Sequence, residues 1–312
     1  MNKNFNIITV TGPTACGKTR IAVRIALRYG GEIISGDSRQ VYRGMDIGTG
    51  KDLDEYITES GPVPYHLIDI ADPSEDYNLF RYVNDFDKTF DLITGRKKIP
   101  VLCGGSGLYI EAAVKGYDLP DIPENNGLRE ELEGIPKEKL LSILKEESPE
   151  IYSRTDISSS RRIIRGIEIA RYMKNSNISA EPKRPARYTP LVIAVAFPRE
   201  EVIRRIDSRL DKRLKEGMIS EVETLIKQGV PVSRLIKLGL EYRYCAMYLN
   251  GEIAYDRMVE KLGTEIHRFA KRQMTWLRGM ERRGLPFHWI KGDDIDAAFD
   301  IIDNAGFRPA DS

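Results

Sequence analysis

The chain has 312 residues, of which 41% are hydrophobic and 30% are charged, and its formal net charge is +1. This composition is typical of a folded globular protein and excludes a wholly disordered chain. The three cysteines are too far apart for a disulfide framework or a zinc site. The sequence also lacks a signal-peptide core and any apolar stretch of membrane-spanning length. We therefore expect a cytoplasmic protein with no membrane partner.

The first 115 residues alternate short β-branched runs with amphipathic stretches, which favours a parallel sheet covered by helices. Helices are predicted after Lys18, over 79–95 and after Gly107. Strands are predicted at 6–11, 32–35, 65–70, 99–103 and, after a long interruption, 191–197.

The interruption at 117–188 is bounded by prolines, and its middle is typical of charged amphipathic helices. We predict an inserted helical domain there, within a core made of residues 1–116 and 189–312. Helices are predicted in the later part of that core at 200–216, 219–228 and 256–283. The last helix carries an apolar stripe that should pack on the sheet, formed by Leu262, Ile266, Phe269, Trp276 and Met280.

Residues 12–19 fit the pattern G-x-x-x-x-G-K-[ST], directly after a predicted strand and before a predicted helix. In such a loop the backbone amides cradle phosphate oxygens, Lys18 reaches the anion, and the Thr19 hydroxyl can ligate magnesium. The pattern predicts a P-loop NTPase-like α/β fold, and it is also typical of ATP-binding proteins. The predicted pyrophosphate-binding residues are Gly12, Pro13, Thr14, Ala15, Cys16, Gly17, Lys18 and Thr19.

Two further segments follow predicted strands and should therefore share the ligand-binding rim of the sheet. Asp37 ends the second strand, and the glycine-rich segment 104–109 ends another. The Asp37 carboxylate could accept a proton, ligate magnesium or cap the following turn, and the residues leave these alternatives open. Ser106, in the glycine-rich segment, is expected to meet Asp37.

Basic residues gather in two stretches despite the balanced total charge. There are nine Lys or Arg against three Asp or Glu over 154–187, and eight against three over 257–283. Such stretches suit a polyanion, although solvated helix faces would explain either of them equally well.

Five blocks resemble the tRNA dimethylallyltransferases, and the resemblance runs from about residue 7 to residue 278. The blocks are the P-loop at 12–19, Asp-Ser-Arg-Gln-Val-Tyr-Arg-Gly-Met-Asp-Ile-Gly-Thr at 37–49, Gly-Gly-Ser-Gly-Leu-Tyr at 104–109, Arg-Arg-Ile-Ile-Arg-Gly-Ile-Glu at 161–168, and Ala-Lys-Arg-Gln-Met-Thr-Trp-Leu-Arg at 270–278. The zinc-finger extension of the eukaryotic members is absent, which points to the bacterial form.

The sequence departs from the family pattern at four places. Cys16 stands where the family usually has Ser, and Ser106 stands where it has Thr. Gly50-Lys51-Asp52 replaces Ala-Lys-Pro. A Gly-Tyr-[KR]-Glu block is replaced by Gly239-Leu240-Glu241-Tyr242-Arg243.

The resemblance implies transfer of a dimethylallyl group from dimethylallyl diphosphate to the N6 amine of adenosine 37, in tRNAs that read codons beginning with U. It implies that Asp37 is the base, that Ser106 hydrogen-bonds Asp37, that Arg209 is a further cation at the diphosphate, and that magnesium on Thr19 is the cofactor. The partner would be the tRNA anticodon stem-loop, and a monomer is expected. The implied tRNA-binding residues are Asp37, Ser38, Arg39, Gln40, Ser106, Arg129, Arg161, Arg162, Arg165, Lys271, Arg272, Gln273, Thr275, Trp276 and Arg278.

Three alternatives share parts of this pattern. A P-loop small-molecule kinase would use the same loop, acid and magnesium, but it leaves the basic stretches unexplained. An adenylate isopentenyltransferase would prenylate a free nucleotide, and an RNA-binding protein that has lost catalysis would need neither Lys18 nor Asp37.

Overall fold

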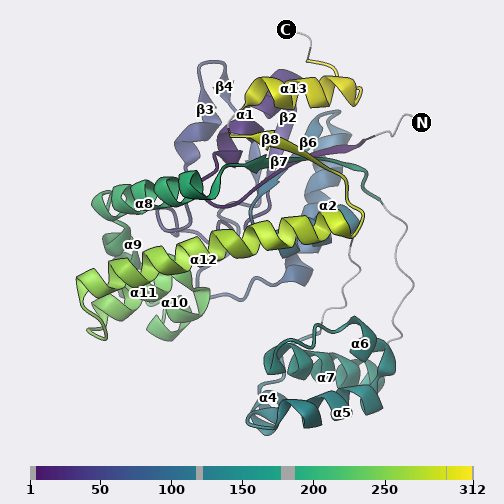
Figure 1. Ribbon diagram of the computed structural model, residues 1–312, viewed down its shortest axis with the longest axis vertical. Coiled ribbons are helices and arrows are strands. Elements are labelled where there is room, and N and C mark those ends of the chain that lie inside the picture. The colour runs from purple at the N-terminus through teal and green to yellow at the C-terminus, as the bar shows by residue number, and fades with distance from the viewer. Residues whose placement is uncertain (1–4, 117–121, 177–186, 293, 311–312) are drawn as a thin grey trace. The chain divides into compact units, whose positions relative to one another are not determined.

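The structure is a computed structural model that describes residues 5–116, 122–176, 187–292 and 294–310. The chain divides into two compact units (Figure 1). The core unit comprises Met1–Tyr117 and Ala186–Ser312, and the helical unit comprises Asp118–Pro185. The helical unit thus falls within the stretch 117–188, which the sequence marks as an insertion.

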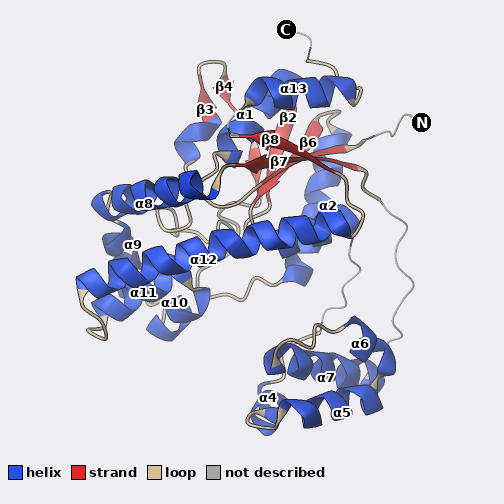
Figure 2. Ribbon diagram, viewed as in Figure 1, coloured by secondary structure: helices blue, strands red, loops and turns tan. Residues whose placement is uncertain are grey.

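A parallel sheet forms the centre of the core unit. Its strand order is β5-β2-β6-β1-β7-β8, and every neighbouring pair is parallel. All residues of β1 and β2 are buried, because a parallel sheet is covered by helices on both faces (Figure 2). The strands are β1 Ile7–Thr11, β2 Gly31–Ser35, β5 Tyr65–His66, β6 Ile99–Gly104, β7 Pro190–Ala196 and β8 Phe287–Lys291.

Two layers of helices cover this sheet. Helices α1 (Lys18–Tyr29) and α13 (Ile295–Asn304) share one apolar cluster with the strands, and they lie above the sheet in Figure 1. Helices α2 (Leu79–Gly95) and α3 (Gly107–Lys115) contact β6 from the other face. The predicted helices after Lys18, over 79–95 and after Gly107 are therefore confirmed.

The chain after β7 adds a group of helices around the long α12. The bounds of this group are α8 Arg199–Lys215, α9 Met218–Lys227, α10 Val232–Leu238, α11 Leu240–Leu249 and α12 Tyr255–Arg282. A short 3₁₀ helix, η1 (Leu53–Tyr56), and a hairpin of β3 (Ile57–Thr58) and β4 (Gly61–Pro62) precede β5. None of the helices in the described ranges is both long enough and apolar enough to cross a bilayer.

The buried face of α12 differs in part from the predicted stripe. Leu262, Ile266 and Met280 are buried as predicted, but Trp276 is 36% exposed. Helical geometry places the buried residues three or four positions apart, and Trp276 falls off that line. The buried face consists of Met258, Leu262, Ile266, Ala270, Gln273, Leu277 and Met280.

The described part of the helical unit contains four helices and connecting loops. They are α4 Asn126–Leu132, α5 Lys137–Glu147, α6 Pro149–Arg154 and α7 Ser160–Asn175. The side chain of Ser159 caps α7 by accepting a hydrogen bond from the backbone amide of Arg162. The unit has its own apolar core, formed by Leu128, Leu132, Leu140, Leu144, Ile163, Ile167 and Ala170.

Several elements differ from the sequence-based expectation. The strand predicted at 65–70 ends at His66, because Leu67 and Asp69 adopt left-handed backbone angles (φ 61° and 57°) that interrupt an extended chain. The edge strand β8 was not predicted, since its apolar residues follow the long α12 and Pro286 without a clear alternation. Helices α10 and α11 were missed as well, being short and separated only by Gly239.

Candidate active site

A cavity of about 840 Å³ opens in the core unit at the carboxyl ends of the strands. It is lined by the P-loop, by the segments after β2 and β6, and by residues of α8, α11 and α12. Cationic side chains outnumber carboxylates in this lining. The cavity therefore suits a small anion, as the crevice at the strand ends of an open α/β sheet commonly does.

The P-loop is held to α12 by one buried side chain. Gln273, which is 7% exposed, accepts a hydrogen bond from the Thr14 amide at 2.8 Å and donates one to the Gly105 carbonyl at 2.9 Å. The Lys18 ammonium donates to the Pro13 carbonyl at 3.0 Å and lines the cavity. The amide of Gln273 thus joins the P-loop to the glycine-rich segment, and its contact with tRNA stays a prediction.

Asp37 lies just after β2, on the same cavity as the P-loop. Its Oδ1 accepts a hydrogen bond from the Arg39 amide at 2.8 Å, so one of the roles left open by the sequence, the capping of the following turn, is observed. Within the described residues its other carboxylate oxygen has no hydrogen-bond partner. A single carboxylate thus caps the turn and keeps one oxygen for further chemistry.

Ser106 contacts the neighbour of Asp37 rather than Asp37 itself. Its Oγ accepts from the Ser38 amide at 3.0 Å and donates to the Ser38 hydroxyl at 3.3 Å. The expected Ser106–Asp37 hydrogen bond is therefore wrong. The strand ends meet so closely here that a Cβ atom on Gly104 would lie 2.3 Å from the Gly36 carbonyl oxygen, which explains the glycine.

Gln40, one of the predicted tRNA-binding residues, has both ends of its amide hydrogen-bonded within the protein. Its Oε1 accepts from the Ser35 hydroxyl at 2.9 Å, and its Nε2 donates to the Gly50 carbonyl at 3.0 Å. Gln40 therefore connects the end of β2 to the loop at Gly50, and its contact with tRNA stays a prediction. Arg39 and Ser38 line the same cavity, and their contact with tRNA stays a prediction.

Two arginines of α8 lie one helical turn apart beside the P-loop, and only the first was predicted. Arg209 and Arg213 both line the cavity, and each approaches the backbone of Gly50. Arg213 is buried and lies near Glu241 of α11. The i, i+4 spacing of the two arginines could have indicated that Arg213 shares the cavity with Arg209. Arg213 matches no family block, however, and its burial depends on a segment far away in the sequence.

The three cysteines are free thiols, and all of them are buried. Burial raises the pKa of Cys16 in the P-loop, although the nearby Lys18 charge opposes this. Burial likewise raises the pKa of Cys103 to about 12 and that of Cys245 to about 12. The cysteines therefore stay protonated near neutral pH and supply no nucleophile.

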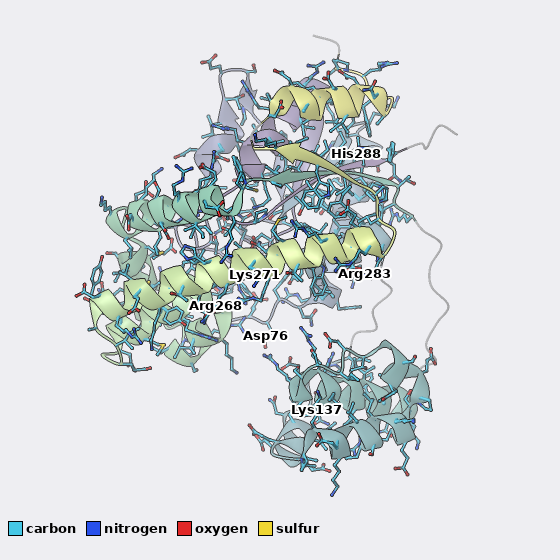
Figure 3. All side chains as sticks on the ribbon, in the orientation of Figure 1. Asp76, Lys137, Arg268, Lys271, Arg283 and His288 are labelled. Atoms are coloured by element: carbon cyan, nitrogen blue, oxygen red, sulfur yellow. The ribbon has the colours of Figure 1, made fainter. Side chains whose placement is uncertain are left out.

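Cationic side chains line the exposed side of α12, where Figure 3 labels Arg268 and Lys271. Arg268 pairs with Glu265 at 2.6 Å, whereas Lys271, Arg272 and Arg278 have no ion-pair partner in the part of the chain that the structure describes. Thr275 is exposed, with its hydroxyl donating to the Lys271 carbonyl at 3.0 Å. Trp276 packs so closely on Gly107 that a Cβ atom there would lie 2.3 Å from its ring.

In the helical unit, most of the predicted tRNA-binding arginines serve other contacts. Arg129 and Arg165 both bind the carboxylate of Glu168, which is 2% exposed. Arg162 pairs with Asp156. Arg161 alone of these four is exposed and without an ion-pair partner among the described residues. Arg129 and Arg165 thus stabilise this unit, and their contacts with tRNA stay predictions.

The residues present fit a magnesium ion held mainly by its ligand's phosphates. The described residues contain no cluster of three or more His, Cys, Asp or Glu side chains that could form an all-protein site. Thr19 and Asp37, however, offer oxygen atoms on the cavity of the P-loop. Magnesium commonly takes one or two protein oxygens and completes its shell with phosphate and water.

Comparisons with known proteins agree with this geometry. Residues 40–280 match the family described as IPP transferase, and residues 5–61 match isopentenyl transferase. The chain is 50% identical over 287 residues to tRNA dimethylallyltransferase 1 of Porphyromonas gingivalis, covering 91% of this chain and 93% of the relative. It is 48% identical to tRNA dimethylallyltransferase 1 of Syntrophus aciditrophicus, covering 94% and 95% of the two chains.

Solved structures give the same result. The crystal structure of the full-length tRNA isopentenylpyrophosphate transferase of Bacillus halodurans matches with a TM-score of 0.67 and 31% identity, over 97% of this chain and 95% of that one. A eukaryotic dimethylallyltransferase acting on tRNA shares the fold, with a TM-score of 0.77, 21% identity and coverage of 99% and 81%. The fold is P-loop NTPase-like, and the chain belongs to the tRNA dimethylallyltransferases, a family of prenyltransferases.

Proposed function

We propose that the protein transfers the dimethylallyl group of dimethylallyl diphosphate to the N6 amine of adenosine 37, in tRNAs that read codons beginning with U. One observation carries the proposal: the P-loop, Asp37 and Arg209 line a single cavity in a member of this family. The relatives' names supply tRNA as the acceptor.

The acceptor chemistry calls for a base. The N6 amine of adenine is a weak nucleophile, because its lone pair is delocalised into the ring. A carboxylate that takes the N–H proton as the C–N bond forms lowers this barrier. We assign that role to Asp37, whose Oδ1 stays on the Arg39 amide while its second oxygen takes the proton.

The leaving group calls for positive charge. As the bond between the allylic carbon and the diphosphate oxygen breaks, negative charge grows on the diphosphate. The P-loop amides, the Lys18 ammonium and the Arg209 guanidinium would bind that charge. Magnesium, held by the Thr19 hydroxyl together with the diphosphate, would add further positive charge.

Recognition of the tRNA anticodon stem-loop would use both units. The target base has to turn out of its stack to enter the cavity, at a cost of a few kcal/mol. Lys271, Arg272 and Arg278 on α12, and Arg161 on α7, are exposed cations suited to the flanking phosphates. We further propose that the enzyme acts as a monomer in the cytoplasm.

The test is an acceptor comparison with purified protein, magnesium and labelled dimethylallyl diphosphate. The acceptors are an unmodified tRNA with adenosine at position 37, the same transcript with guanosine there, AMP and ATP. Label should enter only the first transcript, and nuclease mapping should locate it at position 37. Label on AMP or ATP would instead identify a nucleotide prenyltransferase, and transfer to none of them would contradict the proposal.

A further inference from the structure

Arg213 is a buried cation of the core unit that lacks a close partner of opposite charge in the part of the chain that the structure describes. Other buried charged groups have close partners: the Lys51 ammonium donates to the Tyr42 carbonyl at 2.8 Å, and Glu111 accepts from Arg283 at 2.7 Å. Arg213 is only 6% exposed, yet within the described ranges its one hydrogen bond is a long one of 3.4 Å to the Gly48 carbonyl. Its Nη2 is fully buried and has no hydrogen-bond partner among the described residues.

The charges around Arg213 do not compensate for this. Carboxylate oxygens of Glu241 and Asp52 lie 3.8 Å and 3.9 Å away, beyond hydrogen-bond distance. Arg209, one turn earlier on α8, adds a like charge. Burial, followed by the Arg209 charge, lowers the pKa of Arg213 to about 10. Burying a cation without a hydrogen-bonded anion costs folding free energy. We therefore expect an anion to bind at Arg213.

The position of Arg213 indicates which anion that is. Arg213 lines the P-loop cavity, and a small adjoining hollow brings it together with Thr14, Ala15 and Arg209. These are the residues that would surround a diphosphate bound at the P-loop. A guanidinium offers a planar fork of donors that matches phosphate oxygens.

Two departures from the family pattern meet at this arginine. Gly50 stands where the family usually has Ala, and a Cβ atom there would lie 1.6 Å from Arg213 Nη2. Glu241, which lies 3.8 Å from Arg213, belongs to the segment 239–243 that replaces the Gly-Tyr-[KR]-Glu block. Arg213 thus lies between two segments in which this chain departs from the family pattern.

We infer that Arg213 is a second guanidinium that binds the diphosphate of the donor beside Arg209, with Glu241 as its counter-ion when the donor is absent. The inference rests on the proposed function only in taking this cavity as the donor site. Diphosphate oxygens would supply the close partners that Glu241 and Asp52 do not.

The experiment measures binding of inorganic pyrophosphate, with magnesium, to the full-length protein by calorimetry. Arg213→Gln should raise the dissociation constant at least tenfold, the size expected for loss of a charge-assisted hydrogen bond, and Arg213→Lys should recover part of the affinity. Glu241→Gln should tighten binding, because it removes the competing anion. The control is Arg257→Gln, an exposed residue of α12 paired with Glu260, which should bind as the wild type does.

A structural role for the pair makes different predictions. If Arg213 only held α8 to α11, Arg213→Gln and Glu241→Gln would both weaken binding and both lower the unfolding midpoint, which would overturn the inference. The double variant Arg213→Gln/Glu241→Gln removes both charges together; it should fold and still bind pyrophosphate weakly. In assays with tRNA, Arg213→Gln should raise KM for dimethylallyl diphosphate and leave KM for tRNA unchanged.

The wild type and Lys18→Ala separate this inference from the proposed function. If the wild type bound no pyrophosphate, or if Lys18→Ala bound it normally, the P-loop site itself would fail, and the inference with it. If Lys18→Ala lost binding while Arg213→Gln bound normally, only the inference about Arg213 would fail.

Discussion

The carboxylate of Asp37 has two roles that a substitution can separate. Its Oδ1 holds the turn at Arg39 through a 2.8 Å hydrogen bond, and the proposed chemistry uses the second oxygen. Alanine would remove both roles at once. Asparagine keeps an oxygen for the turn and removes only the basicity, because an amide does not accept a proton near neutral pH.

We therefore expect Asp37→Asn to lower the single-turnover rate of transfer by about 10² to 10⁴, the range of general-base catalysis, with tRNA affinity unchanged. The rate is measured with saturating tRNA and dimethylallyl diphosphate. Asp54→Asn is the control, since Asp54 is exposed in η1 and does not line the cavity. Full activity of Asp37→Asn would remove Asp37 as the base.

Among the elements, α9 is joined to the loop before Gly50 by a single carboxylate. Glu221 accepts hydrogen bonds from the backbone amides of Asp46, Ile47 and Gly48 at 2.9, 2.6 and 3.1 Å. It also accepts from the Tyr242 hydroxyl at 2.7 Å. The same loop leads to Gly50, whose carbonyl accepts a hydrogen bond from Gln40. Glu221 therefore holds in place a loop that lines the cavity.

Glu221→Ala should lower the free energy of unfolding by about 3 kcal/mol, since it leaves several partly buried donors without partners. Urea unfolding followed by circular dichroism measures this change. Glu223→Ala is the matched control on the same helix, because Glu223 is half exposed and pairs with Lys227 at 2.7 Å. Its effect should stay within about 0.5 kcal/mol. Equal effects of the two variants would contradict this role of Glu221.

In the helical unit, Glu168 makes stability depend on pH. Burial raises the pKa of its carboxyl, but the Asn125 amide and the guanidinium groups of Arg165 and Arg129 outweigh burial and hold the pKa below its ordinary value of 4.5. A group whose pKa is lower in the folded state stabilises the fold at pH values above its unfolded pKa. That contribution is lost as pH falls below about 4.5.

Wild-type protein should therefore be more stable than Glu168→Gln at pH 7, and the difference should shrink as pH is lowered from 4.5 toward 3. Urea unfolding at a series of pH values gives the difference in unfolding free energy. Glu146→Gln, an exposed residue of α5, should show no such dependence. A difference that stayed constant down to pH 3 would mean that the Glu168 charge is unimportant.

For the whole molecule, the near-zero net charge does not show that some cations are paired with carboxylates and others, within the described ranges, are unpaired. In the helical unit, Arg129, Arg162 and Arg165 are neutralised by carboxylates of the same unit. On α12, Lys271 and Arg272 are exposed without such partners in the described residues. Phosphate contacts should therefore depend more on α12 than the sequence, which shows similar basic stretches in both places, suggests.

The double variant Lys271→Ala/Arg272→Ala should weaken tRNA binding and reduce the salt dependence. Each lost phosphate contact reduces the steepness of the plot of log K against log salt by about 0.7 to 0.9. The two losses together should reduce it by about 1.4 to 1.8. Filter binding at several salt concentrations measures the slope. Arg129→Ala should leave the slope unchanged, although it should destabilise the helical unit. An unchanged slope in the double variant would contradict a tRNA-binding role for this face.

The parts of the molecule that sequence could predict are those set by local chemistry. The P-loop, the strand before it and the cavity-lining position of Asp37 follow from short patterns with a fixed geometry. Contacts between segments that lie far apart along the chain could not be predicted in this way. Gln273 meets Thr14 across 259 positions, and the burial of Arg213 depends on the segments at Gly50 and Glu241.

The burial of all three cysteines has a practical consequence. Because Cys16, Cys103 and Cys245 are buried and their pKa values are raised, maleimide dyes should react with them slowly in the folded protein. Native thiols can then be kept, and one cysteine introduced on the surface of each unit would be labelled selectively. Single-molecule energy transfer between such dyes would follow the distance between the core and helical units directly as tRNA is added.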